Sequence, residues 1–457
     1  MHRENHLPEN KMGVMPIGKL LFNMALPIVI AMLVQALYNV VDSIYVSRIS
    51  ESAVTALSLA FPVQNIQIGF GTGIGVGVNA LLSKSLGEGD QKTANRAAGN
   101  GLFLVLLVTA AFVAFGLFGA RPYFEMQSNV GETVDGGTIY TTICCLFSVG
   151  IFVEILGERL LQSSGRTFYT LITQGTGAVV NIILDPVFIF GVDALGIAPM
   201  GIAGAAVATV IGQWVAAILA VIFNLKCNPE VQFRFASILP CKHVLRPILM
   251  VGVPSTVMVA IGSVMNFSMN QILQGFSETA TGVFGIYFKL QSFFFMPLFG
   301  LNNATISIVA FNYGARNPQR IKGTLKRACI TAIIIMVVGF LAFQFVPDLL
   351  LGIFHPSDEF LRIGRSALRI ISISFPMAAV GIALGASFQA LGNGIYATIV
   401  SLCRQMLVLL PAAYLLSLTG EVTNVWWAYP IAEIMSLTVT LLLFLRIYRQ
   451  KIKPMTE

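Results

Sequence analysis

The stretch PIVIAMLVQALYNVVDSIY, residues 27–45, decides the fold and function expected of this chain. It is apolar over most of its length, with Pro27 at its start and Asn39 and Asp42 near its end. A carboxylate inside a lipid-embedded helix costs roughly 2.5–3.5 kcal/mol on insertion scales, so a chain that keeps one usually needs it. A proline inside a helix removes one backbone hydrogen bond and permits a hinge. The stretch therefore predicts a bendable membrane helix that carries a titratable group.

The composition of the whole chain is that of a membrane protein. Of its 457 residues, 56% are hydrophobic and only 11% are charged, and the mean hydropathy is +0.80. Apolar runs of about twenty residues recur from end to end, and each can cross about 30 Å of hydrocarbon as a helix. Outer-membrane strands would be shorter and would alternate in polarity. We expect twelve transmembrane helices, near residues 20–45, 53–83, 97–119, 136–162, 168–191, 200–224, 247–274, 280–311, 325–353, 363–391, 395–418 and 425–446.

The second half of the chain repeats the first. An offset of 227 residues separates Pro27 from Pro254 and Asn39 from Asn266. The same offset recurs at Ser50 and Ser277, Phe61 and Phe288, Gln64 and Gln291, Gly73 and Gly300, Gly87 and Gly314, Gln162 and Gln389, and Gly165 and Gly392. Because six spans separate the copies, both halves enter the membrane with the same orientation. This predicts an all-α polytopic protein with two six-helix bundles related by a pseudo-two-fold axis along the membrane normal, and with a cleft between them. The expected domains are residues 1–225 and 247–457, joined by a cytoplasmic linker, residues 226–246.

The charge distribution predicts the orientation. Lys and Arg gather in alternate loops, including the one from Lys226 to Arg246, and in the C-terminal tail. Since basic loops stay inside, both termini are expected in the cytoplasm of a bacterium, with the chain in its inner (plasma) membrane. The net charge of +7 therefore reflects orientation and does not indicate nucleic-acid binding. The N-terminal segment has no short apolar core, so we expect no removable signal peptide.

Four polar residues are expected to form an ion site in the first half. Asp42 and Asp185 lie at similar depth in the first and fifth spans, and Asn181 shares a helix face with Asp185. Thr209, in the sixth span, lies at a matching depth. Pro186, which follows Asp185, leaves a backbone carbonyl one turn earlier in its own helix without its usual hydrogen bond. Two carboxylates, an amide and a hydroxyl make an oxygen-rich site for H⁺ or Na⁺. The alternative is that these groups only bond one another or water.

The second half does not repeat this site. Asp42 corresponds to Met269, so coupling-ion chemistry is expected in the first half alone. Glu433 and Arg404 could form an ion pair near mid-membrane. Glu154 and Glu158 share a face of the fourth span, and Glu154 is a candidate contact for a cationic ligand. The candidate residues for the substrate cleft are Gln64, Glu154, Asn266, Asn270, Tyr287, Gln291 and Phe295. Surfaces of Met and aromatic residues, such as the run that contains Tyr287 and Phe295, can repack around varied apolar shapes.

Five segments resemble the multidrug and toxic compound extrusion (MATE) family, and most of all its MepA-like bacterial branch. They are ALPIVIAMLVQALYNVVDSIYVSRIS, LLQSSGRTFY, NIILDPVFIFG, GIAGAAVATVIGQ and FNYGARNPQRIK. The resemblance implies a secondary active antiporter that exports cationic and amphipathic drugs in exchange for H⁺ or Na⁺ by alternating access. It implies ion coupling at Asp42, Asn181, Asp185 and Thr209, and bending at Pro27. The acidic residue that some relatives carry in the seventh helix is absent here.

Other classes of function find little support in the sequence. The glycine-rich GFGTGIGVGVN, residues 69–79, lies inside a span rather than after a strand, so it does not predict a nucleotide site. No HExxH or GxSxG motif is present, and the chain is not expected to be an enzyme. The partners expected are drugs and the bilayer, for a monomer with no nucleic acid, no cofactor and no metal beyond a Na⁺ at the coupling site. The rival hypothesis is a flippase or exporter of a lipid-linked saccharide, for which only Lys289 and Arg404 supply cationic groups within spans.

Overall fold

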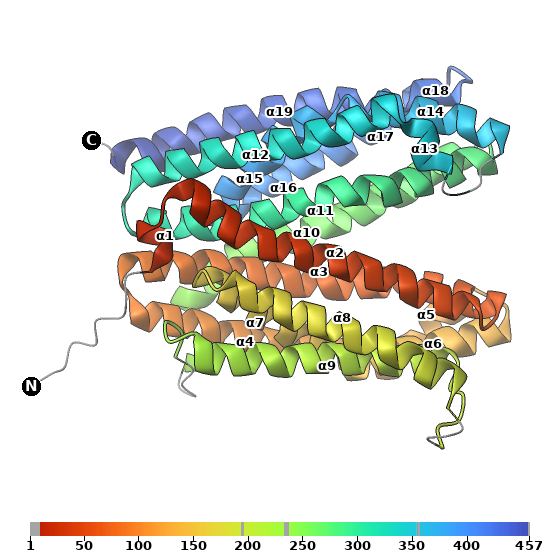
Figure 1. Ribbon diagram of the computed structural model, residues 1–457, viewed down its shortest axis with the longest axis horizontal. Helices are drawn as coiled ribbons and strands as arrows, with labels where there is room; N and C mark the ends of the chain where they lie inside the picture. Colours follow the sequence, from red (N-terminus) through yellow and green to blue (C-terminus); the bar gives the residue numbers. More distant parts are fainter. Residues whose placement is uncertain (1–9, 193–195, 233–236, 353, 355–356, 456–457) are drawn as a thin grey trace, which may run out of the picture. The chain divides into compact units, whose positions relative to one another are not determined.

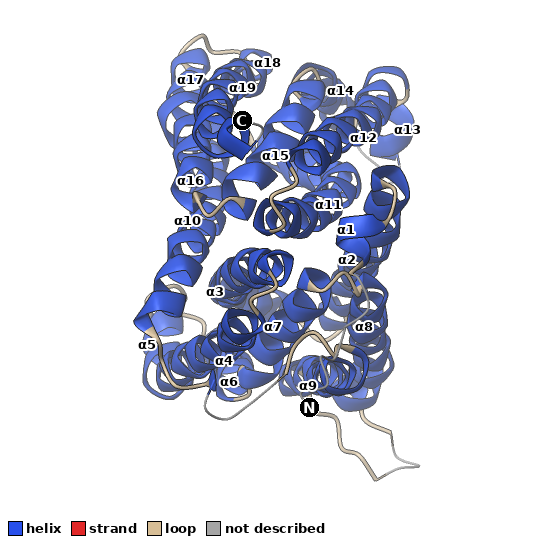
Figure 2. Ribbon diagram, turned by 90° about the vertical axis from the view of Figure 1, so that its left-hand side faces the viewer, coloured by secondary structure: helices blue, strands red, loops and turns tan. Residues whose placement is uncertain are grey.

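The computed structural model describes residues 10–192, 196–232, 237–352, 354 and 357–455, and in these ranges the chain is helical with no strand (Figure 2). One isolated bridge joins Val192 to Ile197. The helices of the first half, followed along the chain in Figure 1, are α1 (Lys11–Val14), α2 (Ile17–Ser47), α3 (Glu51–Glu88), α4 (Gln91–Ala114), η1 (Phe115–Gly119), α5 (Ala120–Glu125), α6 (Gly131–Leu146), α7 (Val149–Ser163), α8 (Thr167–Phe190) and α9 (Ile202–Cys227). Those of the second half are α10 (Lys242–Gln274), α11 (Glu278–Gly314), α12 (Pro318–Phe345), α13 (Pro347–Gly352), α14 (Asp358–Ser372), α15 (Phe375–Ala390), α16 (Gly394–Leu402), η4 (Cys403–Leu409), α17 (Leu410–Ser417), α18 (Val422–Val425), α19 (Ala428–Ile447), η5 (Tyr448–Ile452) and η6 (Lys453–Met455).

The number of spans confirms the all-α polytopic fold. Within the described residues, ten helical segments are long and apolar enough to cross a membrane, and the total is 12 if each of two bent pairs counts as one span. Each bent pair is the fourth span of its half: α6 with α7, bent by 48°, and α14 with α15, bent by 47°. The sequence predicted both as continuous helices. Pro376 restarts α15 because it lacks a backbone N–H, whereas the first break has no proline, so hydropathy alone shows neither bend.

The internal repeat extends to the local geometry of the turns. Ser50 caps α3 by accepting a hydrogen bond from the Ala53 N–H, and Ser277 caps α11 by accepting one from the Ala280 N–H. These two caps are related by the 227-residue offset, and so are the caps at Asp90 and Asn317, which begin α4 and α12. A side-chain oxygen at this position satisfies an N–H that the first helical turn leaves unpaired. The shared offset therefore reflects a shared structure.

The turn before α12 departs from that symmetry. Gly89, which ends α3, adopts φ +74°, and the equivalent residue in the second half is Arg316 with φ +51°. Among the described residues, Arg316 is the only non-glycine residue with a positive φ. Glycine tolerates this left-handed conformation, whereas a side chain makes it strained. The second half keeps the turn because Asn317 still caps α12 through the Arg320 N–H.

The chain forms two compact units, and two of the boundaries between them fall inside helices. The first unit contains Met1–Val14 and Ile30–Thr256, and the second contains Met15–Val29 and Val257–Glu457. The boundaries therefore fall inside α2 and inside α10. In both helices the boundary lies a short way after a proline: after Val29 in α2, which contains Pro27, and after Thr256 in α10, which contains Pro254.

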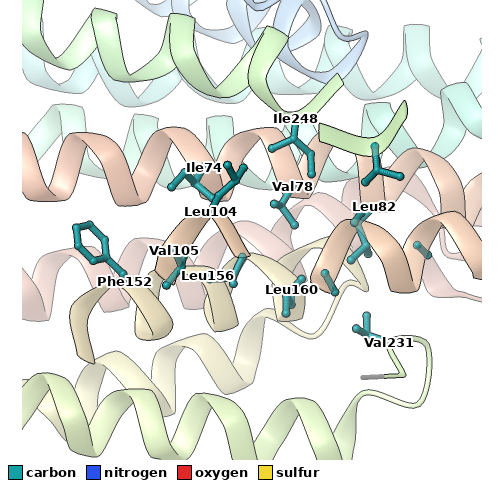
Figure 3. Packing of buried hydrophobic residues seen from close by; sticks show 14 of the residues in the cluster. Ile74, Val78, Leu82, Leu104, Val105, Phe152, Leu156, Leu160, Val231 and Ile248 are labelled. Atoms are coloured by element: carbon teal, nitrogen blue, oxygen red, sulfur yellow. The ribbon is translucent and has the colours of Figure 1, made fainter. Parts of the chain in front are cut away.

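The first unit has a continuous apolar core (Figure 3). Ile74, Val78 and Leu82 from α3 pack with residues of α4, α7 and the first turns of α10, namely Leu104, Val105, Phe152, Leu156, Leu160 and Ile248. Burying each such side chain contributes about 1.5–3 kcal/mol where water is the alternative, and dispersion packing replaces that gain where lipid is. This core fixes α7, which packs against α8 and α9, two of the helices that carry the candidate ion site.

A polar cluster ties α1 to the loop that follows α9 within the first unit. The Asn10 amide donates to Glu230 Oε2 at 2.8 Å and to the Ser164 carbonyl at 3.3 Å. Burial raises the pKa of Glu230 above its ordinary value, and burial lowers the pKa of Lys11, which lies near Arg166 and Glu230. Met12 is fully buried beside them. These contacts anchor the chain where it enters α2.

Candidate ion-coupling site

The four residues predicted to couple an ion lie in the first unit and are all buried. Asp185 is 0% exposed, Asn181 is 2% exposed, Thr209 is 6% exposed and Asp42 is 8% exposed. Asn181 and Asp185 lie on α8, Thr209 lies on α9, and Asp42 lies on α2. Asp42 and Asp185 are close enough for their charges to interact. Burial of two carboxylates together in a membrane span has a high free-energy cost, which is typical of a functional site.

Asn181 holds Asp185 in place. In one orientation of the amide, its nitrogen lies 3.4 Å from Asp185 Oδ1 and 3.3 Å from Thr209 Oγ1. Turning the amide over lets its nitrogen donate to Asp185 Oδ2 at 3.2 Å while its oxygen accepts from the Thr209 backbone N–H at 3.1 Å. We prefer the second orientation because it satisfies both ends of the amide. Asn181 thus links the Asp185 carboxylate of α8 to the backbone of α9.

Glycines allow α8 and α9 to approach closely enough for that link, and the two helices lie side by side in Figures 1 and 2. A Cβ on Gly212 would lie 2.7 Å from the Gly177 carbonyl and 3.1 Å from Asn181 Cβ. A Cβ on Gly204 would lie 2.4 Å from the Phe188 carbonyl. Both contacts are too short for a side chain, so small residues here are required for the helices to pack.

Asp42 is buried without a full set of partners. Its Oδ1 makes no hydrogen bond in the part of the chain that the structure describes. A buried carboxylate oxygen with no donor is strongly unfavourable, unless a proton or a cation satisfies it. The chemistry of Asp42, Asp185 and the Thr209 hydroxyl therefore fits H⁺, or a Na⁺ held by hard oxygen ligands.

Two tyrosines that the sequence did not predict border this site. Tyr38 lies near enough to Asp42, Asp185 and Glu154 for their charges to act on its hydroxyl. Tyr140 lies near Asp42 and accepts a hydrogen bond of 2.8 Å from the Gln64 amide. Tyr38 precedes Asp42 by four residues, which places both on one helix face, and that spacing could have revealed it. Tyr140 comes from α6, and no local pattern connects it to Asp42.

Of the candidate cleft residues, Gln64 and Glu154 lie in the first unit. Gln64 is placed beside the ion-site carboxylates by its bond to Tyr140. Glu154 is half-buried and lies close to Glu158. Glu158 accepts a 3.1 Å hydrogen bond from the Thr173 hydroxyl. This bond gives Glu158 a structural role. Glu154 remains the acidic candidate for contact with a cationic ligand.

The other five candidates lie in the second unit. Tyr287 is 2% exposed, and its hydroxyl donates to Gln291 Oε1 at 2.6 Å. Phe295 packs edge-on against Phe375, with ring centroids 5.4 Å apart. Asn270 is half-buried, as is Asn266, whose Oδ1 is buried with no hydrogen bond in the described residues. Tyr287 and Phe295 thus belong to the packing of this unit, and a role in binding stays a prediction for all five.

The ion pair suggested between Arg404 and Glu433 is confirmed. Arg404 Nη1 lies 3.4 Å from Glu433 Oε2, between η4 and α19. The six cysteines are free, and Cys144 and Cys145 are buried.

Matching glycine contacts hold the first halves of α2 and α10. A Cβ on Gly300 of α11 would lie 2.7 Å from a side-chain carbon of Val29, within the second unit. A Cβ on Gly73 of α3 would lie 2.6 Å from the Gly252 carbonyl and against Thr256, within the first unit. Both glycines and both facing residues are related by the 227-residue offset. Each contact involves the last residue before a unit boundary, Val29 in α2 and Thr256 in α10.

Up to twelve spans among the described residues, arranged in two repeated halves with paired carboxylates buried inside one half, define a polytopic membrane transporter. The model of the MatE family matches residues 27–187 and 254–415, so the two matches begin 227 residues apart and follow the internal repeat. The chain belongs to the MatE family, which confirms the resemblance drawn from the sequence.

Relatives and solved structures agree over nearly the full length. The multidrug export protein MepA of Staphylococcus saprophyticus is 24% identical over 431 residues, which cover 94% of both chains. MepA of Staphylococcus aureus is 25% identical over 428 residues, 92% of this chain and 91% of that protein. The crystal structure of MATE in complex with MaL6 superposes with a TM-score of 0.90 at 25% identity, covering 98% of this chain and 99% of that one. An outward-facing multidrug resistance MATE transporter has the same TM-score at 24% identity, over the same shares of the two chains, and shows the shared fold.

Proposed function

We propose that this protein is a secondary active antiporter that exports cationic and amphipathic drugs from a bacterial cell in exchange for H⁺ or Na⁺. The observation that carries the proposal is the buried Asp42–Asp185 pair, with one oxygen of Asp42 left without a hydrogen bond in the described residues. Relatives that match over nine-tenths of the chain are multidrug export proteins, which supports drugs as the cargo.

The coupling step follows from competition for the same carboxylates. While Asp42 and Asp185 are both ionised, they repel each other and attract a cation. A bound drug cation relieves that repulsion, and so does a proton or a Na⁺. Because Asn181 and Thr209 hold Asp185 in a fixed position, Asp42 on α2 is the group that moves when the charge changes. Ion entry thus displaces the drug and changes the force on α2 near Pro27.

The flippase hypothesis is the second candidate. A lipid-linked saccharide carries phosphate, so its site needs accessible cationic groups. In the first unit the charged groups next to the ion site are carboxylates, the buried Asp42 and Asp185 and the half-buried Glu154, which favours a cationic cargo. Efflux of a fluorescent cationic drug from proteoliposomes tests the two directly: the proposal requires ion-gradient-driven efflux, whereas a flippase for an anionic lipid would not move the drug.

Pro27→Ala is expected to leave expression and drug binding intact but to slow transport roughly tenfold, because the hinge in α2 is stiffened. Transport rate is measured in proteoliposomes under an imposed gradient, and binding is measured on the purified protein. Pro62→Ala in α3 is the matched control, since Pro62 is also inside a helix but lies far in sequence from a unit boundary. A wild-type rate for Pro27→Ala would show that α2 does not bend there during transport.

The orientation predicts which loops can be labelled from outside. In a cysteine-free background, Phe235→Cys should not react with an impermeant maleimide in intact cells, whereas Ser357→Cys should react. Phe235 lies outside the described residues, in the basic loop between α9 and α10, and Ser357 caps α14. Both sites should react after the cells are permeabilised. Equal labelling of the two in intact cells would reverse the proposed topology.

A further inference from the structure

The Arg404–Glu433 pair is a second charged cluster that the ion-coupling proposal does not use. Arg404 lies near the middle of the span Gly394–Ser417, in the π-helix η4, and Glu433 lies on α19. π-Helical segments inside α-helices are rare and are frequent at functional sites, because they turn side chains out of the regular register. Charged residues inside a membrane span also mark a functional site by default.

The two partners are unequally exposed. Glu433 is 7% exposed, whereas the Arg404 side chain remains 30% exposed. The single contact is from Arg404 Nη1 to Glu433 Oε2, although a guanidinium has five N–H groups arranged for two-point binding of a carboxylate. Among the described residues, Arg404 makes no other hydrogen bond. The accessible side of this neutral pair is therefore its positive side.

Glycines, which carry no side chain, lie next to the Arg404–Glu433 pair. A Cβ on Gly385 of α15 would meet nothing within 4 Å. One turn earlier, a Cβ on Gly381 would meet only Glu433 Oε1 at 3.9 Å, and a Cβ on Gly262 of α10 would meet only an atom of Gln405, the neighbour of Arg404, at 3.8 Å. Two helices, α15 and α10, thus present glycine backbone near the pair. The half-buried Tyr429 adds a hydroxyl near Arg404 that is buried with no hydrogen bond in the described part of the chain.

We propose that Arg404, held in place by Glu433, binds the anionic group of an amphipathic organic anion or zwitterion, such as an aromatic carboxylate. Glu433 is already neutralised by Arg404, so the pair offers little to a cation. A lipid phosphate is a poor fit, because Arg404 lies near mid-span and phosphates lie at the interface. The inference rests on the proposed export function, to which it adds a second class of cargo bound in the second unit.

The test uses two probes with the same ring and opposite charge, 1-naphthaleneacetate and 1-naphthylmethylamine, titrated calorimetrically at neutral pH into purified protein in an uncharged detergent. Arg404→Gln should weaken naphthaleneacetate binding about tenfold or more, as expected for loss of a charge-assisted hydrogen bond. Glu433→Gln should strengthen it, because the guanidinium loses its competing carboxylate. Arg404→Gln should not weaken binding of the amine and should strengthen it, because Glu433 loses its cationic partner. Glu433→Gln should not strengthen binding of the amine.

The opposite signs of the two variants separate a binding role from a structural one. If the pair only stabilised the fold, both variants would weaken both probes together, or would change neither. Arg365→Gln is the matched control, since it breaks the exposed Arg365–Asp348 ion pair of the same unit and should leave both affinities unchanged. If Arg404→Gln folds poorly, Arg404→Lys is the alternative variant. It keeps the positive charge but loses the paired N–H groups of the guanidinium, so it should weaken naphthaleneacetate binding by a smaller factor.

Two results would overturn the inference: no binding of naphthaleneacetate to the wild type, or shifts of the same sign in Arg404→Gln and Glu433→Gln. The measurement needs no ion gradient, so it is independent of coupling. Anion binding without gradient-driven cation efflux would contradict the antiport proposal alone. Cation efflux without anion binding would contradict this inference alone.

Discussion

Asp185→Asn is expected to reduce gradient-driven efflux of a cationic dye to the rate of protein-free vesicles while the protein still folds and inserts. Asparagine keeps the shape of the side chain and can still bond Asn181, but it cannot gain or lose a charge. Asp42→Asn should have the same effect, because the two carboxylates act as one coupled pair. The measurement compares dye efflux from proteoliposomes with and without an imposed pH or Na⁺ gradient.

The control for these variants is Asp348→Asn, which removes an exposed carboxylate of the second unit and should leave efflux unchanged. Glu158→Gln tests whether the loss of any buried carboxylate would abolish gradient-driven efflux. It should keep gradient dependence, because Glu158 is accounted for by its bond to Thr173. If Asp42→Asn and Asp185→Asn still accelerate with the gradient as the wild type does, the coupling site lies elsewhere, with Glu154 and Glu433 as the next candidates.

Gly212→Val is expected to abolish transport and to destabilise the first unit by about 1–3 kcal/mol, the usual result of overpacking. Its Cβ would lie 2.7 Å from the Gly177 carbonyl, a backbone atom that cannot move aside, and 3.1 Å from Asn181 Cβ. Separation of α8 from α9 would break the bond from Thr209 N–H to Asn181 and release Asp185. Thermal unfolding of the purified protein and dye efflux are the two measurements.

Gly175→Val is the matched control. It makes the same glycine-to-valine change on the neighbouring helix α8, at a position where a Cβ would meet nothing within 4 Å. It should cost only the small loss of helix propensity that valine brings. If Gly212→Val unfolds at the same temperature as Gly175→Val and transports at the same rate, the close approach of α8 and α9 does not position the site.

Much of the fold follows from the sequence because the bilayer restricts the choices. Apolar runs of the right length must be helices, so the spans could be counted before the structure. The 227-residue offset predicted two related halves, and these share local features such as the helix N-caps at Ser50 and Ser277. The bends within the fourth span of each half were not predicted. Hydropathy does not change across Ser148 or Ser374, where the chain turns.

The candidate site was predictable only where its residues share a helix or a chemical type. Asn181 and Asp185 are four residues apart on α8, and carboxylates are conspicuous in apolar spans, so the group of four could be proposed and the structure brings them together. Tyr140 and the glycine contact at Gly212 depend on α6 and α9 packing against other helices. Distances between helices are not encoded in a local pattern. The roles of these residues in transport stay predictions.

The most direct measurement of the central claim is ion counterflow. Wild-type protein is reconstituted in vesicles with a pH-sensitive or Na⁺-sensitive dye inside, and a cationic drug gradient is imposed with no ion gradient. The account predicts that drug movement in one direction drives H⁺ or Na⁺ in the other, and that Asp185→Asn abolishes this ion flux. Drug movement with no counterflow of either ion, or equal counterflow in Asp185→Asn, would contradict it.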